Sequence, residues 1–549
     1  MRTLLLRTVL FTAILVTGPF SVGEATPRLG VVIVLDQFCA EHLERYGHLF
    51  KGGLARLSDG GTVFAEAHHD HAMTLTATGH ATISTGSYPN RHGVVGNHWI
   101  ERATGSRVYS CDDSSVQVVG DIEAVGQSPR HLMTDALGDW LKRERPGARV
   151  FAVSQKDRSA IMLGGRRPDG VFWFDDAKGR FVTSTFYMDS LPSWASGYDC
   201  FPFREKAIRE GWTKGWPEET YSLAHEDAFA AENDGIAITF PHVYDSANAV
   251  ARTPSEWLLE TPFSDEMTLD FVRELVSSES LGRDAIPDLL FVSMSAIDYI
   301  GHSFGPHSHE VLDALLRADV YLAHFLSALD SMVGAGSYFV TLSSDHGVMP
   351  LPEETSRRGE PAERILRAET KQHFEAASRQ VADAIGLAQP LIIGQTNGLI
   401  LDTKIAEEKG VRPPDLRKAL AEAVAKLDFV EEVYTYEDLS APGKNGDDYL
   451  GMYRKSFHPD RTPDLVVQFK ENILVLESRY GTTHGTPYRY DTHVPLIFWG
   501  SGVADGSKPV KDRVRTIDIA PTLAILLGLK VPEGIDGVIL PDVFPEDAQ

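Results

Sequence analysis

The stretch VVIVLDQF, residues 31–38, decides the fold of this chain: five consecutive apolar residues end at a single carboxylate, Asp36. A short, uninterrupted apolar run of this kind is typical of a strand in a parallel sheet that is buried on both faces. In open sheets of this class, ligands bind beyond the carboxyl ends of the strands. Asp36 therefore stands where a binding or catalytic site is expected.

Similar apolar runs recur along the chain and alternate with helical patterns. Strands are predicted at Val150–Val153, Leu289–Met294, Tyr338–Leu342 and Val494–Trp499, and helices near 43–54, 131–143, 265–278 and 310–333. This alternation predicts the α/β class, with a doubly wound, mostly parallel sheet sandwiched by helices.

Two regions interrupt the alternation within a domain that we place at residues 26–549. The first, about 172–262, is rich in aromatic residues, Pro and Gly, and we interpret it as an insertion at a pocket mouth. The second, about 350–472, has helical patterns at 361–385 and 414–427 and is predicted to be an inserted cap subdomain. Near the C-terminus, Thr516 has the sequence context of a helix N-cap.

The N-terminus has the pattern of an export signal. Arg2 and Arg7 flank an apolar segment, Val9–Val16, and Gly23-Glu24-Ala25 resembles a cleavage site. We expect residues 1–25 to be a signal peptide, because the apolar run is too short for the alternative, a membrane anchor. The expected location is therefore periplasmic or secreted, without stable membrane insertion.

The overall charge restricts the classes of partner. A formal net charge of −25 argues against nucleic acid as a partner, because no broad basic surface could neutralise its phosphates. A small anionic substrate remains compatible with this charge, since metals, Lys and Arg can dominate one pocket. We expect a monomer, although the sequence leaves the oligomeric state open.

Three cysteines, Cys39, Cys111 and Cys200, would allow one disulfide in an oxidising compartment. Cys111 and Cys200 both lie in turn-rich sequence, so we expect this pair to form the bridge. Three free thiols are the alternative.

Six residues with metal-ligand chemistry follow strand-like runs or small-residue turns: Asp36, Asp298, His302, Asp345, His346 and His484. Taken singly, each has a structural explanation, such as a helix N-cap for Asp36 or a satisfied loop histidine for His484. Three carboxylates and three imidazoles brought together at strand ends would bind two divalent cations, most plausibly zinc. The denser cluster at residues 68–71 is interpreted as structural, because consecutive strand residues point to opposite faces.

A threonine-rich turn follows the first of these ligands. Thr74, Thr76 and Thr78 precede a predicted helix, where free N–H groups and the helix dipole favour a phosphate and a nearby cation would activate a hydroxyl. Lys156 and Arg158 are two apart after a strand and could converge on one anion. Asn97, after a glycine turn, could donate to a further oxygen.

The chain resembles the alkaline phosphatase superfamily, in particular PafA-type alkaline phosphatases and the related nucleotide pyrophosphatase/phosphodiesterases. The segments that carry the resemblance occur in the family's order over nearly the whole mature chain: DQF, T-x-T-x-x-GHA, HG-x-x-GN, KDR, D-x-x-GH-x-x-GP, SDHG and HGTPY.

The resemblance implies a role for each matching residue. Thr76 would be the phosphorylated nucleophile, and Asn97, Lys156 and Arg158 would hold the phosphate oxygens. One zinc would be bound by Asp298, His302 and His484, and the other by Asp36, Asp345 and His346, with Thr76 as its exchangeable ligand.

The expected function is that of a di-zinc alkaline phosphatase, which hydrolyses small phosphate monoesters through a phosphothreonine intermediate. Two alternatives remain open: a phosphodiesterase or nucleotide pyrophosphatase with the same zinc site, and a catalytically silent zinc protein that binds phosphorylated ligands.

Overall fold

The structure is a computed structural model of the 549-residue chain, and it describes residues 27–248, 252–387, 390–396, 398–442, 446, 448–506 and 508–546. The predicted signal peptide lies outside the described residues. Within them, no helix is both long and apolar enough to cross a membrane.

A nine-stranded sheet forms the centre of the molecule, in the order β19-β2-β18-β11-β1-β10-β7-β8-β9. The five strands β11 (Tyr338–Ser343), β1 (Leu29–Leu35), β10 (Asp288–Met294), β7 (Val150–Ser154) and β8 (Gly170–Asp175) are parallel. Strand β18 (His493–Gly500) pairs antiparallel with β11 and with β2 (Thr62–His68), and β9 (Arg180–Val182) pairs antiparallel with β8. Strand β19 (Val510–Arg515) pairs parallel with β2. The predicted α/β fold with a mostly parallel sheet is confirmed.

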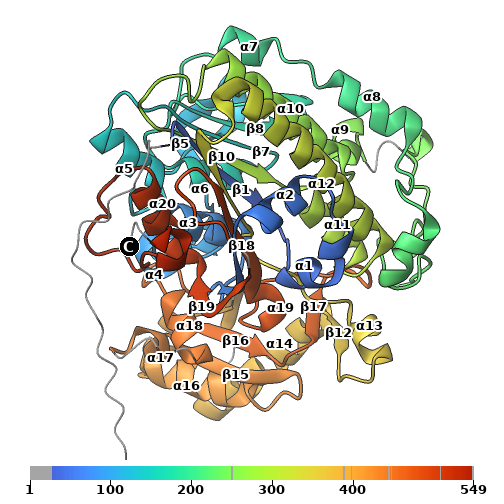
Figure 1. The fold of residues 1–549 in the computed structure, drawn as a ribbon. Coiled ribbons are helices and arrows are strands. Elements are labelled where there is room, and N and C mark those ends of the chain that lie inside the picture. Colours follow the sequence, from blue (N-terminus) through green and yellow to red (C-terminus); the bar gives the residue numbers. More distant parts are fainter. Residues whose placement is uncertain are drawn as a thin grey trace, which may run out of the picture.

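Strand β1 is buried on both faces, as its composition predicted. Val31 and Ile33 belong to one hydrophobic cluster, whereas Val32 and Val34 belong to the other. Helices α2 (Gly53–Gly60), α10 (Phe263–Ser278), α11 (Ala296–Phe304) and α12 (His309–Leu329) complete the first cluster. The second cluster also contains residues of helices α3 (Thr76–Thr85), α5 (Leu137–Glu144), α6 (Asp157–Gly164) and α20 (Ile519–Leu526). Helices therefore cover both faces of the sheet (Figure 1).

Several predicted boundaries differ from the structure. The single helix expected near 43–54 is two helices, α1 (Ala40–Tyr46) and α2, separated by a 3₁₀ turn. The helix expected from residue 361 begins only at α14 (Arg367–Ile385), because residues Glu363–Leu366 form strand β12. Thr516 opens a 3₁₀ turn, and Asp518 takes the N-cap position of α20 instead.

The segment expected as the first insertion begins inside the main sheet, since Phe172 lies in β8. The later expected insertion contains a separate four-stranded sheet, β13 (Ile392–Gln395), β14 (Leu399–Leu401), β16 (Leu465–Phe469) and β15 (Val430–Thr435), in that spatial order. With α14 and α16 (Pro413–Val424) it encloses its own hydrophobic cluster. Figure 1 shows this sheet and its helices at the lower end of the molecule, below the main sheet.

The expected disulfide between Cys111 and Cys200 is wrong in this structure, where all three cysteines are buried and free. Cys111 lies in one of the two main hydrophobic clusters and Cys200 in the other. Because these clusters cover opposite faces of the sheet, turn-rich sequence around both cysteines was not sufficient to bring them together.

Candidate active site

The carboxyl ends of three neighbouring parallel strands gather most of the predicted metal ligands. Asp36 follows β1, Asp345 and His346 follow β11, and Asp298 lies in the first turn of α11, which follows β10. Since β1 lies between β11 and β10, these side chains converge at one edge of the sheet.

The first group consists of Asp36, Asp345 and His346, which are fully buried and offer ligand atoms that all lie within 4.8 Å of one another. His346 Nε2 lies 3.2 Å from Asp345 Oδ2 and 3.6 Å from Asp36 Oδ1. Its Nδ1 donates to the carbonyl of Gly347 at 2.9 Å, so that Nε2 presents a lone pair to the carboxylates. Metal-binding histidines are commonly oriented by such a hydrogen bond.

The second group consists of Asp298, His346 and His484, again with ligand atoms within 4.8 Å of one another. His302 is attached to this group through Asp298, with its Nε2 3.4 Å from Oδ1. The Nδ1 atoms of His302 and His484 donate to backbone carbonyls, at 2.9 and 2.6 Å. The structure thus brings all six residues together, but it places His346 between the two groups.

The buried carboxylates at this centre fit a cation. Asp36 Oδ1 and Asp345 Oδ2 are buried and accept no hydrogen bond from the described residues. Burial, together with Asp298 and Asp345, raises the pKa of Asp36 well above its usual value. Burial also lowers the pKa of His484 well below normal, so this imidazole is neutral and able to act as a ligand. Unsatisfied charges of this kind are costly unless a metal or another cation compensates them.

Lys156 supplies positive charge to the centre in this structure. Its Nζ lies 2.6 Å from Asp36 Oδ2 and 2.5 Å from Asp298 Oδ2, and its side chain is buried. Burial alone would raise the pKa of Asp298, but Lys156 and His302 lower it well below the usual value. The ammonium also lies 5.2 Å from the ring centroid of Tyr299.

The expectation that Lys156 and Arg158 converge through extended chain is wrong, because α6 begins at Asp157 and Lys156 is its N-cap residue. Lys156 points to the carboxylates, whereas Arg158 lies beside Asp157, at 4.0 Å, with Tyr109 and Tyr299 nearby. Burial would lower the pKa of Arg158, but these neighbours raise it, and its Nε–H donates to no acceptor among the described residues.

Thr76 is the first residue of α3, and its hydroxyl lies 3.4 Å from His346 Nε2. Asn97 approaches the same helix end, because the backbone N–H of Ala77 donates to its Oδ1 at 2.9 Å. This bond orients the amide so that Nδ2 remains available to donate. The hydroxyl of Thr74 instead donates to the carbonyl of Thr486, although its backbone carbonyl accepts from His484 Nδ1. The Thr78 hydroxyl is buried without a partner among the described residues, so Thr76 is the one of the three whose hydroxyl contacts a metal-type side chain.

Sequence reasoning missed two residues that brace the ligands. Gln37 has a left-handed φ of 69°, its Nε2 donates to Asp298 Oδ1 at 2.9 Å, and its N–H donates to Asp345 Oδ1 at 3.2 Å. His80 contacts the carbonyl of Thr76 at 2.8 Å and Asp345 Oδ2 at 3.2 Å. The motifs DQF and GHA contained both residues, but neither spacing nor composition indicated their contacts.

The dense cluster at residues 68–71 is dispersed among structural contacts. His69 contacts the carbonyl of Ser344 and the hydroxyl of Thr516, both at 2.9 Å. Asp70 forms ion pairs with Lys455 and Arg513. In the part of the chain that the structure describes, His68 alone of the four joins a metal-like group, with Glu66 and His493, and there Arg489 already pairs with Glu66.

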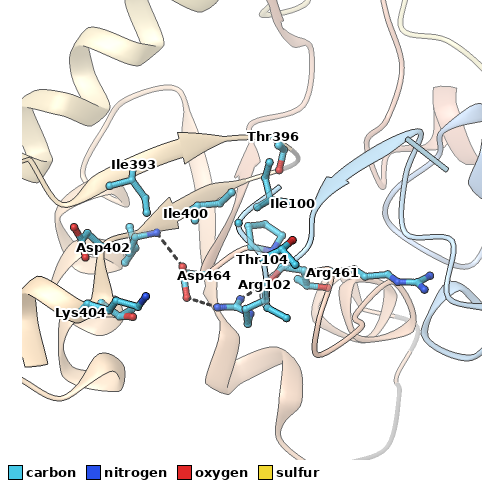
Figure 2. Close-up of a pocket in the computed structure, with 16 residues that line it drawn as sticks. Ile100, Arg102, Thr104, Ile393, Thr396, Ile400, Asp402, Lys404, Arg461 and Asp464 are labelled. Carbon is cyan, nitrogen blue, oxygen red and sulfur yellow. Dashed lines mark hydrogen bonds and ion pairs between the residues drawn. The ribbon is translucent and has the colours of Figure 1, made fainter. Parts of the chain in front are cut away.

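Two larger cavities in the described part of the chain lie along strands of the four-stranded sheet. One, of about 290 Å³, reaches the candidate site, since Leu75, Thr483 and His484 line it together with Arg367, Phe374 and Tyr488. The other, of about 420 Å³, lies where residues 100–105 meet β13 and β14, and Figure 2 shows Asp464 there beside Arg102. The N–H of Leu401 also donates to Asp464, at 2.9 Å. None of the predicted site residues lines this second pocket.

The comparisons with known proteins agree with this architecture. The family model of type I phosphodiesterases and nucleotide pyrophosphatases matches residues 30–493. The chain is 32% identical to alkaline phosphatase PafA of Elizabethkingia meningoseptica over 94% of each protein. It is 30% identical to alkaline phosphatase PhoV of Synechococcus elongatus, over 95% of this chain and 93% of that protein.

The crystal structure of wild-type PafA has a TM-score of 0.87 to this structure at 31% identity, covering 95% of this chain and all of that one. A crystal structure of a PafA variant matches equally broadly, with a TM-score of 0.86. In that variant a threonine is replaced by serine, and an asparagine, a lysine and an arginine are replaced by alanine.

The sheet, with its two groups of metal-type ligands at one edge, defines an enzyme of the alkaline phosphatase class. The chain belongs to the type I phosphodiesterase/nucleotide pyrophosphatase family. Its similarity to PafA over nearly the whole length confirms the predicted resemblance to PafA-type alkaline phosphatases.

Proposed function

We propose that this protein is a phosphate monoester hydrolase with two zinc ions and a phosphothreonine intermediate on Thr76. The observation that carries the proposal is the position of the Thr76 hydroxyl, at a helix N-terminus and 3.4 Å from His346 Nε2. The alkaline phosphatases to which the chain is similar over nearly its whole length support the choice of monoesters.

The substituted residues of the PafA variant support the proposed roles of four residues. The threonine and asparagine of that variant are as far apart in sequence as Thr76 and Asn97, and its lysine and arginine are as far apart as Lys156 and Arg158. We infer that Thr76 is the nucleophile and that the other three side chains bind the phosphate oxygens.

The proposed zinc ligands are the six converging residues, with Asp36, Asp345 and His346 for one ion and Asp298, His302 and His484 for the other. Mixed carboxylate and imidazole ligands suit zinc. When bound, the two ions supply Lewis-acid stabilisation of negative charge on the attacking and leaving oxygens.

The residues of the chain account for the remaining chemistry. Thr76 Oγ1 forms a bond to phosphorus while the ester oxygen–phosphorus bond breaks and the alcohol departs; water later cleaves the phosphothreonine and releases phosphate. The Nδ2 group of Asn97 and the N–H groups at the start of α3, other than that of Ala77, which binds Asn97 Oδ1, would donate to the non-bridging oxygens. The cavity of about 290 Å³ beside His484 offers space for the alcohol portion of the substrate.

A phosphodiesterase or nucleotide pyrophosphatase is the second candidate, because the matching family model bears that description. The cationic residues distinguish the two. A monoester presents a dianionic group, which benefits from both Lys156 and Arg158, whereas a diester carries one negative charge fewer.

The N-terminal sequence supports export to the periplasm or the medium as the proposed setting. We further propose that the protein acts on small phosphorylated compounds as a monomer. The deciding experiment compares kcat/KM for an aryl phosphate monoester and its methyl diester. A preference for the diester would transfer the assignment to the second candidate, and no turnover of either, with zinc bound, would favour a silent binding protein.

A further inference from the structure

The cavity of about 290 Å³ beside His484 is shared by the candidate active site and helix α14. It is lined by Leu75, which directly precedes the proposed nucleophile Thr76, and by His484, one of the proposed zinc ligands. Arg367 and Phe374 line the same cavity, and they lie seven residues, or two turns, apart on one face of α14. The alcohol portion of a substrate bound at Thr76 therefore enters a space that α14 helps to enclose.

The walls of this cavity are mostly apolar and firmly held. Leu399, Phe374 and Tyr488 line it, and all three are buried. The hydroxyl of Tyr488 donates to the carbonyl of Phe469 at 2.6 Å and accepts from Gln468 Nε2 at 3.1 Å, so the ring is fixed in place. An apolar wall lowers the local dielectric, and an ionic contact made beside it is stronger than the same contact in bulk water.

The charge along the wall is one-sided. Although the chain has a formal net charge of −25, no Asp or Glu among the described residues lines this cavity. Arg367 is the one Lys or Arg that does so in the same part of the chain. An anionic group inside the cavity would meet a guanidinium without a competing carboxylate on the wall.

Arg367 is weakly engaged by the rest of the protein. Its Nε lies 3.2 Å from Glu477 Oε1, and the Glu477 side chain is 83% exposed. Such a surface ion pair contributes little to stability. The guanidinium makes no other ion pair or hydrogen bond with the residues that the structure describes, so its terminal amino groups are able to donate to a ligand in the paired geometry that suits a carboxylate or phosphate.

We propose that the preferred substrates are phosphate monoesters whose alcohol portion carries a second anionic group, and that Arg367 binds this group. The inference rests on the proposed phosphatase function and assigns its substrate class. The contact lies on the alcohol side of the substrate, so it selects among monoesters and is separate from the action of Lys156 and Arg158 on the transferred phosphate.

Kinetics with two matched substrates test the proposal. They are para-carboxyphenyl phosphate and its neutral counterpart of similar shape, para-carbamoylphenyl phosphate. The quantity compared is the ratio of kcat/KM for the carboxylate over the amide within each protein, because comparing this ratio between variants cancels the difference in reactivity between the two phenols. The variants are Arg367→Gln and Arg367→Glu, and Arg379→Gln is the matched control, since Arg379 is exposed on the same helix and does not line the cavity.

The ratio in Arg367→Gln should fall roughly five- to tenfold below that of wild type, the size expected for a charge-assisted hydrogen bond at a partly exposed arginine. Arg367→Glu should lower it further, because the new carboxylate repels that of the substrate, and Arg379→Gln should keep the wild-type ratio. The change should appear in KM, since the contact is remote from the reacting atoms and is made equally in the ground and transition states.

An equal ratio in wild type and Arg367→Glu would overturn this inference and leave monoester hydrolysis in place. A fall in Arg379→Gln as large as that in Arg367→Gln would also overturn it, because the effect would then belong to the overall charge of α14. No turnover of either monoester by the zinc-loaded wild type would instead overturn the proposed function, and the substrate class with it.

Discussion

Lys156 Nζ lies 2.6 Å from Asp36 Oδ2, and both side chains are buried at the carboxyl edge of the sheet. An ammonium group is thus held among the carboxylates that we propose as zinc ligands. Its position makes Lys156 a link between the metal-type residues and the α6 terminus, where Arg158 lies. The chemical role of Lys156 and Arg158 can be separated from their structural role by changing the charge of the substrate.

The double variant Lys156→Ala/Arg158→Ala is expected to lose monoester turnover far more than diester turnover. A hydrogen bond to a charged group contributes roughly 1.5–3 kcal/mol, and about 1.4 kcal/mol is a tenfold change in rate. Allowing for non-additivity, monoester kcat/KM should fall on the order of a hundredfold or more. Kinetics with an aryl monoester and its methyl diester check this, with Lys206→Ala on α8 (Phe201–Glu210) as control. Equal losses on both substrates would make the pair a general binding patch.

Thr76→Ala should abolish the covalent intermediate while zinc binding remains nearly intact, because the six proposed ligands are unchanged. Thr76→Ser should keep part of the activity, since it retains a hydroxyl at the same helix position. Acid trapping with labelled substrate, followed by peptide mapping, locates the phosphoryl group. A label on Thr74 or Thr78 would show that the nucleophile is misassigned.

Removal of metal should abolish activity and lower the melting temperature together. Ligands from several distant segments join strand ends, so a bound ion stabilises the folded state by mass action. Chelation followed by addition of Zn²⁺, with activity and thermal unfolding recorded at each step, measures both effects. Full activity in a sample shown to be free of metal would contradict a metal-dependent mechanism.

Substitutions at Gln37 test how much its hydrogen bond to Asp298 contributes to zinc affinity, without changing any proposed ligand. Loss of its amide removes the hydrogen bond to Asp298 Oδ1, and changes to such supporting partners typically cost about 10–100-fold in metal affinity. Both Gln37→Gly and Gln37→Ala should therefore bind zinc more weakly. Because φ is 69° here, only Gly fits this backbone without strain, and the Ala variant should melt at the lower temperature. Unchanged zinc affinity in Gln37→Gly would exclude the proposed support.

Protonation of the buried His92 should lower the stability of the folded protein at acid pH. Burial, and then Arg461, lowers its pKa to about 3, and Nδ1 accepts from the N–H of Val94 at 3.1 Å, a bond that protonation would break. Between pH 6.5 and 3 the unfolded state binds the additional proton, so stability falls as the pH falls through this window. His92→Gln should flatten the dependence of melting temperature on pH between 6.5 and 4.5, measured at fixed zinc. An equal slope of melting temperature against pH in both proteins would show that His92 does not contribute to the loss of stability in acid.

Much of the candidate site could be predicted from the sequence because parallel strands bring their carboxyl ends to one edge. The apolar runs before Asp36, Asp298 and Asp345 identified strands, and their parallel order then required the three carboxylates to meet. His302, four residues after Asp298, followed from helical spacing. Periodicity and local chemistry were sufficient for these residues.

Tertiary structure alone decided the contacts between segments that share no local pattern. It set Cys111 and Cys200 on opposite faces of the sheet, turned Lys156 toward Asp36, and gave Gln37 its left-handed backbone and its bond to Asp298. It also buried Glu232 without a hydrogen-bond partner among the described residues. The sequence by itself determined the strands, the order of their ends and the types of ligand there. Packing decided the partners of each buried polar group, because burial depends on all the elements that surround it.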